Sequence, residues 1–88
     1  MEIEFTKAFS KQIDALKNES LRSRLAKTVQ NVISANTLQE IANLKKMKGH
    51  QTAYRIKIGD NRVGLFFEDG IIIFAYLYHR KDIYNKFP

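Results

Sequence analysis

The spacing of apolar residues changes once along this chain of 88 residues, from a helical period to a strand period. Phe5, Phe9 and Ile13 recur at steps of four, which favours an amphipathic helix. From Tyr54 onward, apolar residues alternate with charged ones, as they do in half-buried strands. Because a chain of this length can build only one core, we expect a single α+β domain over residues 1–88.

The first half of the chain predicts one strand and two helices. Alternating polarity over residues 1–5 indicates a short strand. After the first helix, residues 18–20 break the pattern, and residues 21–33 repeat the helical spacing. Two helices joined by so short a turn are expected to form an antiparallel hairpin. Residues 37–40 then match a capping box that opens one brief helical turn.

The second half predicts three strands separated by two turns. Gly59-Asp60-Asn61 separates residues 54–58 from residues 62–68, and Asp69-Gly70 separates those from residues 71–78. The predicted fold is β-α-α-β-β-β, an antiparallel sheet with a two-helix hairpin packed on one face.

Hairpin geometry predicts which side chains share a face of this sheet. A two-residue loop at 59–60 or at 60–61 places Arg55 and Lys57 on the same face as Arg62. A two-residue loop at 69–70 adds Leu77 and His79 to that face, together with Phe66 and Ile73. The helices are expected to cover the opposite face, which carries Val63, Leu65, Phe67, Ile72 and Phe74.

Positive charge is concentrated in the second half of the chain. The net charge is +6, of which residues 1–43 contribute +1 and residues 44–88 contribute +5. Adjacent Arg55, Lys57 and Arg62 repel one another, and a bound phosphodiester would offset that repulsion. The alternative interpretation is a solvated sheet face whose charges serve solubility.

Several classes of site are not indicated. The chain has no cysteine, no cluster of Asp, Glu and His at metal-ligand spacing and no glycine-rich phosphate loop, so neither a metal nor another cofactor is predicted. The first residues do not resemble a signal peptide, and the longest apolar run is too short to cross a bilayer. We therefore expect a cytoplasmic protein without a membrane partner.

Three segments together resemble a known family. These are Leu44-Lys45-Lys46-Met47-Lys48-Gly49, the strand pair from Tyr54 to Val63, and the ending Tyr78-His79-Arg80-Lys81-Asp82-Ile83-Tyr84. Their order and spacing resemble the RelE/ParE superfamily of toxins from toxin-antitoxin pairs, over nearly the whole chain. The resemblance implies the predicted fold, an antitoxin partner and, for the RelE branch, cleavage of messenger RNA on the ribosome without a metal.

The resemblance also implies roles for individual residues. The predicted catalytic residues are Lys57, Arg62, His79, Arg80 and Tyr84. The predicted phosphate-binding residues are Arg55, Lys45, Lys46, Lys48 and Lys81. Lys57 is the candidate general base and His79 is its rival, because imidazole titrates near neutrality. Arg55 replaces the lysine of the best-studied pattern and is expected to clamp phosphate, since arginine keeps its proton.

Two other functions stay open at this point. ParE-like toxins share the fold and inhibit DNA gyrase without cleaving RNA, and a basic module that only binds nucleic acid would carry the same charges. An antitoxin is expected to cover the cationic side chains or to displace the C-terminal segment.

Overall fold

The computed structural model describes residues 1–88 and contains a five-stranded sheet with the strand order β1-β5-β4-β3-β2. The strands are β1 (Glu2–Phe5), β2 (Leu44–Lys46), β3 (Ala53–Ile58), β4 (Asn61–Glu68) and β5 (Ile71–His79). The helices are α1 (Lys7–Ala15), α2 (Glu19–Ser34), the 3-10 helix η1 (Leu38–Glu40) and α3 (Ile83–Lys86). The predicted α+β order is confirmed, with the short elements β2 and α3 added to it.

Both long helices begin at side chains that cap them. The Phe9 backbone N–H donates to Thr6 Oγ1 over 3.1 Å, and the Leu21 N–H donates to Asn18 Oδ1 over 3.0 Å. Each bond satisfies one of the amides that a helix leaves without a partner in its first turn. Since Leu16 to Asn18 is the whole connection between them, α1 and α2 form the predicted hairpin.

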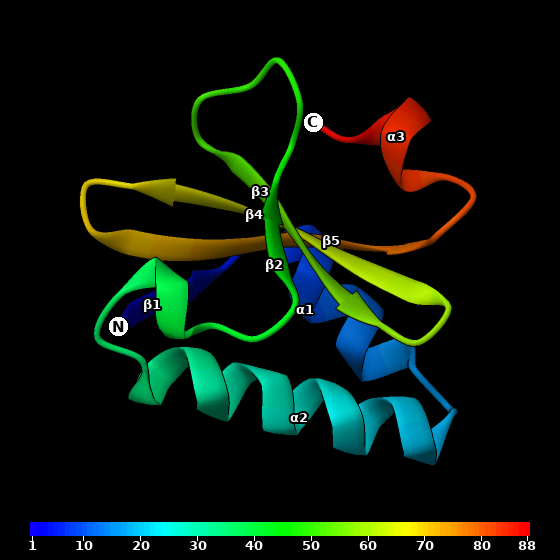
Figure 1. Cartoon of the computed structure of the whole chain (residues 1–88). Coiled ribbons are helices and arrows are strands. Elements are labelled where there is room, and N and C mark those ends of the chain that lie inside the picture. The colour runs from blue at the N-terminus through cyan, green and yellow to red at the C-terminus, as the bar shows by residue number, and fades with distance from the viewer.

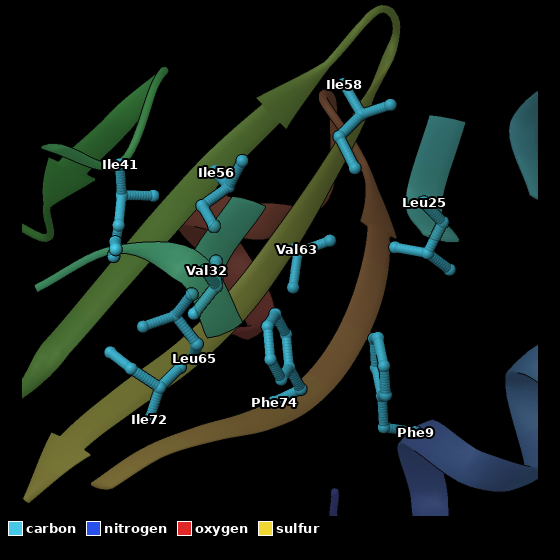
Figure 2. Close-up of a cluster of buried hydrophobic side chains, with 11 residues drawn as sticks. Phe9, Leu25, Val32, Ile41, Ile56, Ile58, Val63, Leu65, Ile72 and Phe74 are labelled. Carbon is cyan, nitrogen blue, oxygen red and sulfur yellow. The ribbon is translucent and has the colours of Figure 1, made fainter. Parts of the chain in front are cut away.

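The hairpin packs on one face of the sheet and forms the main hydrophobic core there (Figure 1). Phe9 of α1 and Val32 of α2 are fully buried against the sheet. Figure 2 shows the strand side chains that meet them, which include Val63, Leu65, Ile72 and Phe74. These four belong to the face for which helix cover is predicted, and Phe67 packs against them as a partly buried neighbour.

The sheet is mixed, because β1 pairs parallel with β5 along Glu2↔Ile71 to Phe5↔Phe74. An entirely antiparallel sheet is therefore a wrong detail of the predicted fold. The first strand has no hairpin connection to any other strand, so local turn chemistry does not determine its direction. Its position is instead held by packing, since Phe5 contacts Phe9 and Phe74 at ring distances of 5.4 and 5.5 Å.

The two hairpins differ in how well turn chemistry predicts their register. In the first, Gly59 has φ 58° and Lys57 pairs directly with Arg62, as expected for a two-residue loop at 59–60. In the second, Asp69 and Gly70 both have positive φ, and the predicted register holds from Glu68↔Ile71 to Leu65↔Phe74.

A β-bulge then shifts the second hairpin by one residue. The shift lies between Gly64 and Leu65, and beyond it Arg62 pairs with Tyr78 while Val63 pairs with Leu77. Because one extra residue exchanges the faces of everything that follows, the predicted placement of Leu77 and His79 beside Arg62 is wrong. Leu77 packs against the main core instead.

The C-terminal segment covers part of the opposite face. Ile83 and Phe87 are buried there with Met47 and Ala53, and Phe66, Ala75 and Tyr78 pack against this second cluster. Figure 1 shows α3 on the side of the sheet away from α1 and α2. The face expected to be free for a ligand is therefore only partly open. No helix of the structure has the length and apolar character that crossing a membrane requires.

Candidate functional site

Four basic side chains lie on the sheet face opposite α1 and α2, and we call this set the cationic face: Lys45, Arg55, Lys57 and Arg62. The registers Lys45↔Arg55 and Lys57↔Arg62 place them in two adjacent rows across β2, β3 and β4. Lys45 and Lys57 are exposed, and Arg55 is half-buried. A shallow hollow of about 220 Å³ lies among Asn43, Leu44, Lys45, Arg55 and Lys57. The predicted side-by-side placement of Arg55, Lys57 and Arg62 is confirmed.

Arg62 is held close to the β3–β4 turn. Its Nη1 donates to the Gly59 carbonyl over 2.7 Å and to the Asn61 carbonyl over 2.9 Å. Arg80 lies at the same turn, because its backbone N–H donates to the Asp60 carbonyl and its Nε is 3.8 Å from Asp60 Oδ1. Both partners of that ion pair are largely exposed, so we assign it little stabilisation. The backbone hydrogen bond to Asp60 places Arg80 beside the end of the cationic face.

A third arginine reaches this turn from the helical hairpin. A Cβ at Gly59 would stand 2.7 Å from Arg24 Nη1, so the guanidinium lies directly against the glycine. The helical pattern places Arg24 only on the outer side of α2, and nothing in the sequence signals that it contacts a turn of the sheet.

Tyr84 is positioned over the cationic face by the packing of its neighbours. Ile83 and Phe87 are buried on either side of it, whereas Tyr84 itself is 67% exposed. Its hydroxyl oxygen accepts a hydrogen bond of 3.2 Å from Arg55 Nε. Phe87 fits because Gly64 has no side chain, since a Cβ there would be 2.9 Å from the ring. The structure thus brings the predicted residues Tyr84 and Arg55 together.

Two tyrosines of β5 also lie on this side of the sheet and are missed by the sequence analysis. Tyr78 pairs with Arg62, and Tyr76 pairs with Gly64, which itself pairs with Arg55. The Tyr78 hydroxyl donates to the Lys86 carbonyl over 3.3 Å. Burial raises the pKa of Tyr78, and the nearby Tyr76 raises it further, so the phenol keeps its proton. The bulge that places both rings here has no recognisable sequence signal.

The remaining predicted residues do not join this group. His79 pairs with Asn61, which pairs with the buried Ile58, so His79 lies on the helical side of the sheet. Its Nδ1 accepts a hydrogen bond of 3.2 Å from the Lys81 backbone N–H. Lys46 pairs with Tyr54 and lies on that same helical side. Lys48 and Lys81 are exposed in loops at different places on the molecule.

The arrangement suits a phosphate ester better than a metal. No three His, Asp or Glu side chains gather as ligands for an ion. Arg55 and Arg62 offer planar donors that match phosphate oxygens, and the Lys57 amine stands in the same rows. The cationic face therefore has the side chains to bind a polyanion and to stabilise added negative charge on a phosphoryl group.

Comparison with known proteins finds relatives that match the whole chain. No protein-family model matches the chain. Toxin RelE3 of Methanocaldococcus jannaschii is 33% identical to it over 89 residues, with all of both chains covered. In the crystal structure of a RelB-RelE antitoxin-toxin complex from Methanococcus jannaschii, one chain matches with TM-score 0.76 and 31% identity, covering 97% of this chain and 99% of that chain.

A more distant solved structure has the same fold. The archaeal RelE-RelB complex from Pyrococcus horikoshii OT3 contains a chain that matches with TM-score 0.71 at 20% identity, covering 92% of this chain and 96% of that chain. With one relative above 30% identity over its full length, the family is established, and the chain belongs to the RelE family of toxins.

Proposed function

We propose that this RelE-family toxin is an endoribonuclease that cleaves messenger RNA on the ribosome and so inhibits translation. The observation that carries the proposal is the direct pairing of Lys57 with Arg62, beside Arg55, on a sheet face that α1 and α2 leave uncovered. In the proposed reaction the ribose 2′-oxygen attacks the adjacent phosphorus and the bond from phosphorus to the 5′-oxygen breaks. The products are a 2′,3′-cyclic phosphate and a 5′-hydroxyl.

Proton transfer at the 2′-oxygen is assigned to Lys57. Its exposed side chain lies in the same row as Arg62 and in the row next to Arg55, where a bound phosphate would lie. His79 is less suited to this role than Lys57, because it lies on the other face of the sheet. The register thus favours one of the two candidate bases that residue type alone leaves open.

Stabilisation of the transition state is assigned to the arginines. Arg62 is fixed by its bonds to Gly59 and Asn61, so it presents its charge without reorganising. Arg55 is oriented by Tyr84. Arg80, at the exposed end of the same face, is proposed to stabilise the negative charge on the leaving 5′-oxygen, which takes its proton from water. No metal ion or cofactor is invoked for these steps.

Binding of the RNA backbone is assigned to the outlying lysines. Lys45 lies at the β2 end of the cationic face. Lys46, Lys48 and Lys81 are exposed outside that face. Such contacts give salt-dependent affinity and position the RNA without reading its sequence.

We infer that an antitoxin is the partner that controls this activity. Two of the structurally similar chains were solved as RelB-RelE complexes. An acidic segment laid on the cationic face, or one that displaces α3 and with it Tyr84, would block the proposed site. Action on translating ribosomes also implies a cytoplasmic location.

Mapping RNA ends by primer extension tests the proposal directly. Messenger RNA from cells expressing the wild-type chain is expected to show cuts in phase with codons, and RNA from cells expressing Lys57→Ala is expected to show none. Inhibition of gyrase, the alternative function, predicts DNA damage with intact messenger RNA. A module that only binds nucleic acid predicts neither cuts nor DNA damage, and either result would contradict the proposal.

A further inference from the structure

Tyr76 is an exposed aromatic ring for which neither the fold nor the proposed reaction has a use. It is one of four large hydrophobic side chains that the chain exposes, and it is 39% accessible. Two of the others, Phe5 and Ile33, belong to the side of the molecule that carries α1 and α2. Tyr76 and Tyr84 instead lie on the side of the cationic face.

Tyr76 lies in the same row of the sheet as Arg55. Arg55 pairs with Gly64, and Gly64 pairs with Tyr76, so two strand spacings separate their backbones, about 10 Å in all. The row between them is occupied by Phe87, whose ring stands against Gly64. The strand pairing of β1 ends at Phe5↔Phe74, so Tyr76 lies beyond the last paired residue of the outer strand.

The ring of Tyr76 packs against the ring of Tyr78. Its centroid is 4.8 Å from that of Tyr78, with an interplanar angle of 31°. Tyr78 is in turn held by Phe87 at 5.9 Å and by its bond to the Lys86 carbonyl. Tyr76 is therefore backed by a fixed aromatic neighbour and remains 39% accessible, which suits a stacking platform.

We propose that Tyr76 is a binding residue on which one base of the RNA stacks, next to the nucleotide whose phosphate lies on Arg55 and Lys57. The inference rests on the proposed function, because it takes single-stranded RNA as the ligand. Single-stranded RNA offers bases and phosphates in alternation, and this row offers an aromatic ring and a cation whose backbones are about 10 Å apart. Stacking of this kind accepts any base, so Tyr76 adds affinity without sequence preference.

Two substitutions separate the ring from its hydroxyl group. Tyr76→Phe keeps the ring and is expected to cleave a short messenger RNA on programmed ribosomes within twofold of the wild-type rate. Tyr76→Leu keeps apolar bulk without an aromatic face, and its apparent KM is expected to rise about tenfold with little change in kcat. Thermal unfolding of both variants checks that the second cluster stays packed.

An abasic nucleotide in the messenger RNA identifies the stacked base. One abasic position is expected to weaken binding by the wild-type chain about tenfold and to have almost no further effect on Tyr76→Leu. If every abasic position weakens the two proteins equally, no base stacks on Tyr76 and the proposal is overturned. The same conclusion follows if Tyr76→Leu matches the wild type in KM, and the exposed ring would then be a contact for protein.

Failure of this inference differs from failure of the proposed function. When the wild-type chain cleaves and the abasic effects are equal in both proteins, only the stacking role of Tyr76 is lost. When the wild-type chain cleaves no RNA, the proposed function itself is wrong. Binding of an uncleavable RNA with 2′-deoxy nucleotides then tests Tyr76 without any reaction, and equal affinity of wild type and Tyr76→Leu would overturn the stacking role as well.

Discussion

The two faces of the sheet are built on different principles, although the same strands supply both. On the helical face, Val63, Leu65, Ile72 and Phe74 are completely buried against α1 and α2. On the other face only a short C-terminal segment packs down, and exposed Lys57 stands beside half-buried Arg62. A strand that alternates its side chains can therefore carry stability on one face and charge on the other, with little interference between them.

Within the face that carries the cations, the boundary between the part packed for stability and the part open for RNA runs across β4. Phe66 and Gly64 lie under the C-terminal segment, whereas Arg62, on the same face and two residues further back, belongs to the open part. Tyr78 links the two parts, because it pairs with Arg62 and also holds the end of α3. Substitutions at this boundary are expected to affect both stability and activity, and those on either side of it only one.

The largest effect is expected for truncation of a buried ring on the helical face. Phe74→Ala should lower the free energy of unfolding by about 3–5 kcal/mol, because it leaves a cavity in the main core. Tyr84→Ala is the matched control, since it truncates an aromatic side chain that is 67% exposed and should change stability by less than about 1 kcal/mol. Urea unfolding measures both. Equal losses would mean that the two faces do not differ as described.

Removal of the Lys57 amine should give the opposite pattern. Lys57→Ala is expected to slow RNA cleavage about 100-fold or more, as loss of a general base does, while stability changes by no more than about 0.5 kcal/mol. Single-turnover cleavage on programmed ribosomes gives the rate. Lys27→Ala, which removes an exposed lysine of α2, is the control and should keep wild-type activity. A Lys57→Ala protein that cleaves normally would refute the assigned base.

A substitution at the boundary should reduce both properties moderately. Gly64→Ala places a methyl group 2.9 Å from the Phe87 ring, so the C-terminal segment must shift, at a cost of about 1–3 kcal/mol. Cleavage should fall as well, because Tyr84 moves with that segment away from Arg55. When Phe87→Ala is also present, Gly64→Ala should lower the free energy of unfolding much less. Urea unfolding of the wild type, the two single variants and the double variant tests this. Strict additivity would contradict the contact.

The smallest effect concerns the raised pKa of Tyr78. Because this phenol is harder to ionise in the folded protein than in the unfolded chain, it contributes stability below pH of about 10 that is lost as pH rises above that value. Tyr78→Phe should be about 1 kcal/mol less stable than wild type at neutral pH, since it loses the bond to Lys86. The difference should shrink above pH of about 10. A constant difference up to pH 11 would contradict the assigned burial.

The sequence predicts those parts of the fold that local chemistry determines. The turn residues around Gly59-Asp60 and at Asp69-Gly70 indicate two hairpins, and either predicted loop at the first turn places Lys57 on the same face as Arg62. Helical spacing and the caps at Thr6 and Asn18 determine the hairpin of α1 and α2. The core face of the sheet follows from the same alternation, so the residues that stabilise the fold are largely identifiable in advance.

Features that depend on distant contacts are not predictable in this way. The bulge lies beside Gly64, against which Phe87 packs from 23 residues further along the chain, and it changes the side on which Tyr76, Tyr78 and His79 lie. The parallel pairing of β1 with β5 and the packing of α3 on the sheet likewise depend on tertiary contacts. For the candidate site, the shared face of Arg55, Lys57 and Arg62 was therefore predictable, whereas the places of Tyr76 and Tyr78 and the exclusion of His79 were not.

One measurement tests most directly whether the cationic face cleaves RNA through its own 2′-hydroxyl. A messenger RNA with a single 2′-deoxy nucleotide on the 5′ side of the cut is incubated with the toxin on programmed ribosomes, beside the unmodified RNA. We predict that the unmodified RNA is cut to 2′,3′-cyclic phosphate and 5′-hydroxyl ends and that the deoxy RNA stays intact. Cleavage of the deoxy RNA at the same position, leaving a 5′-phosphate, would contradict the proposed chemistry.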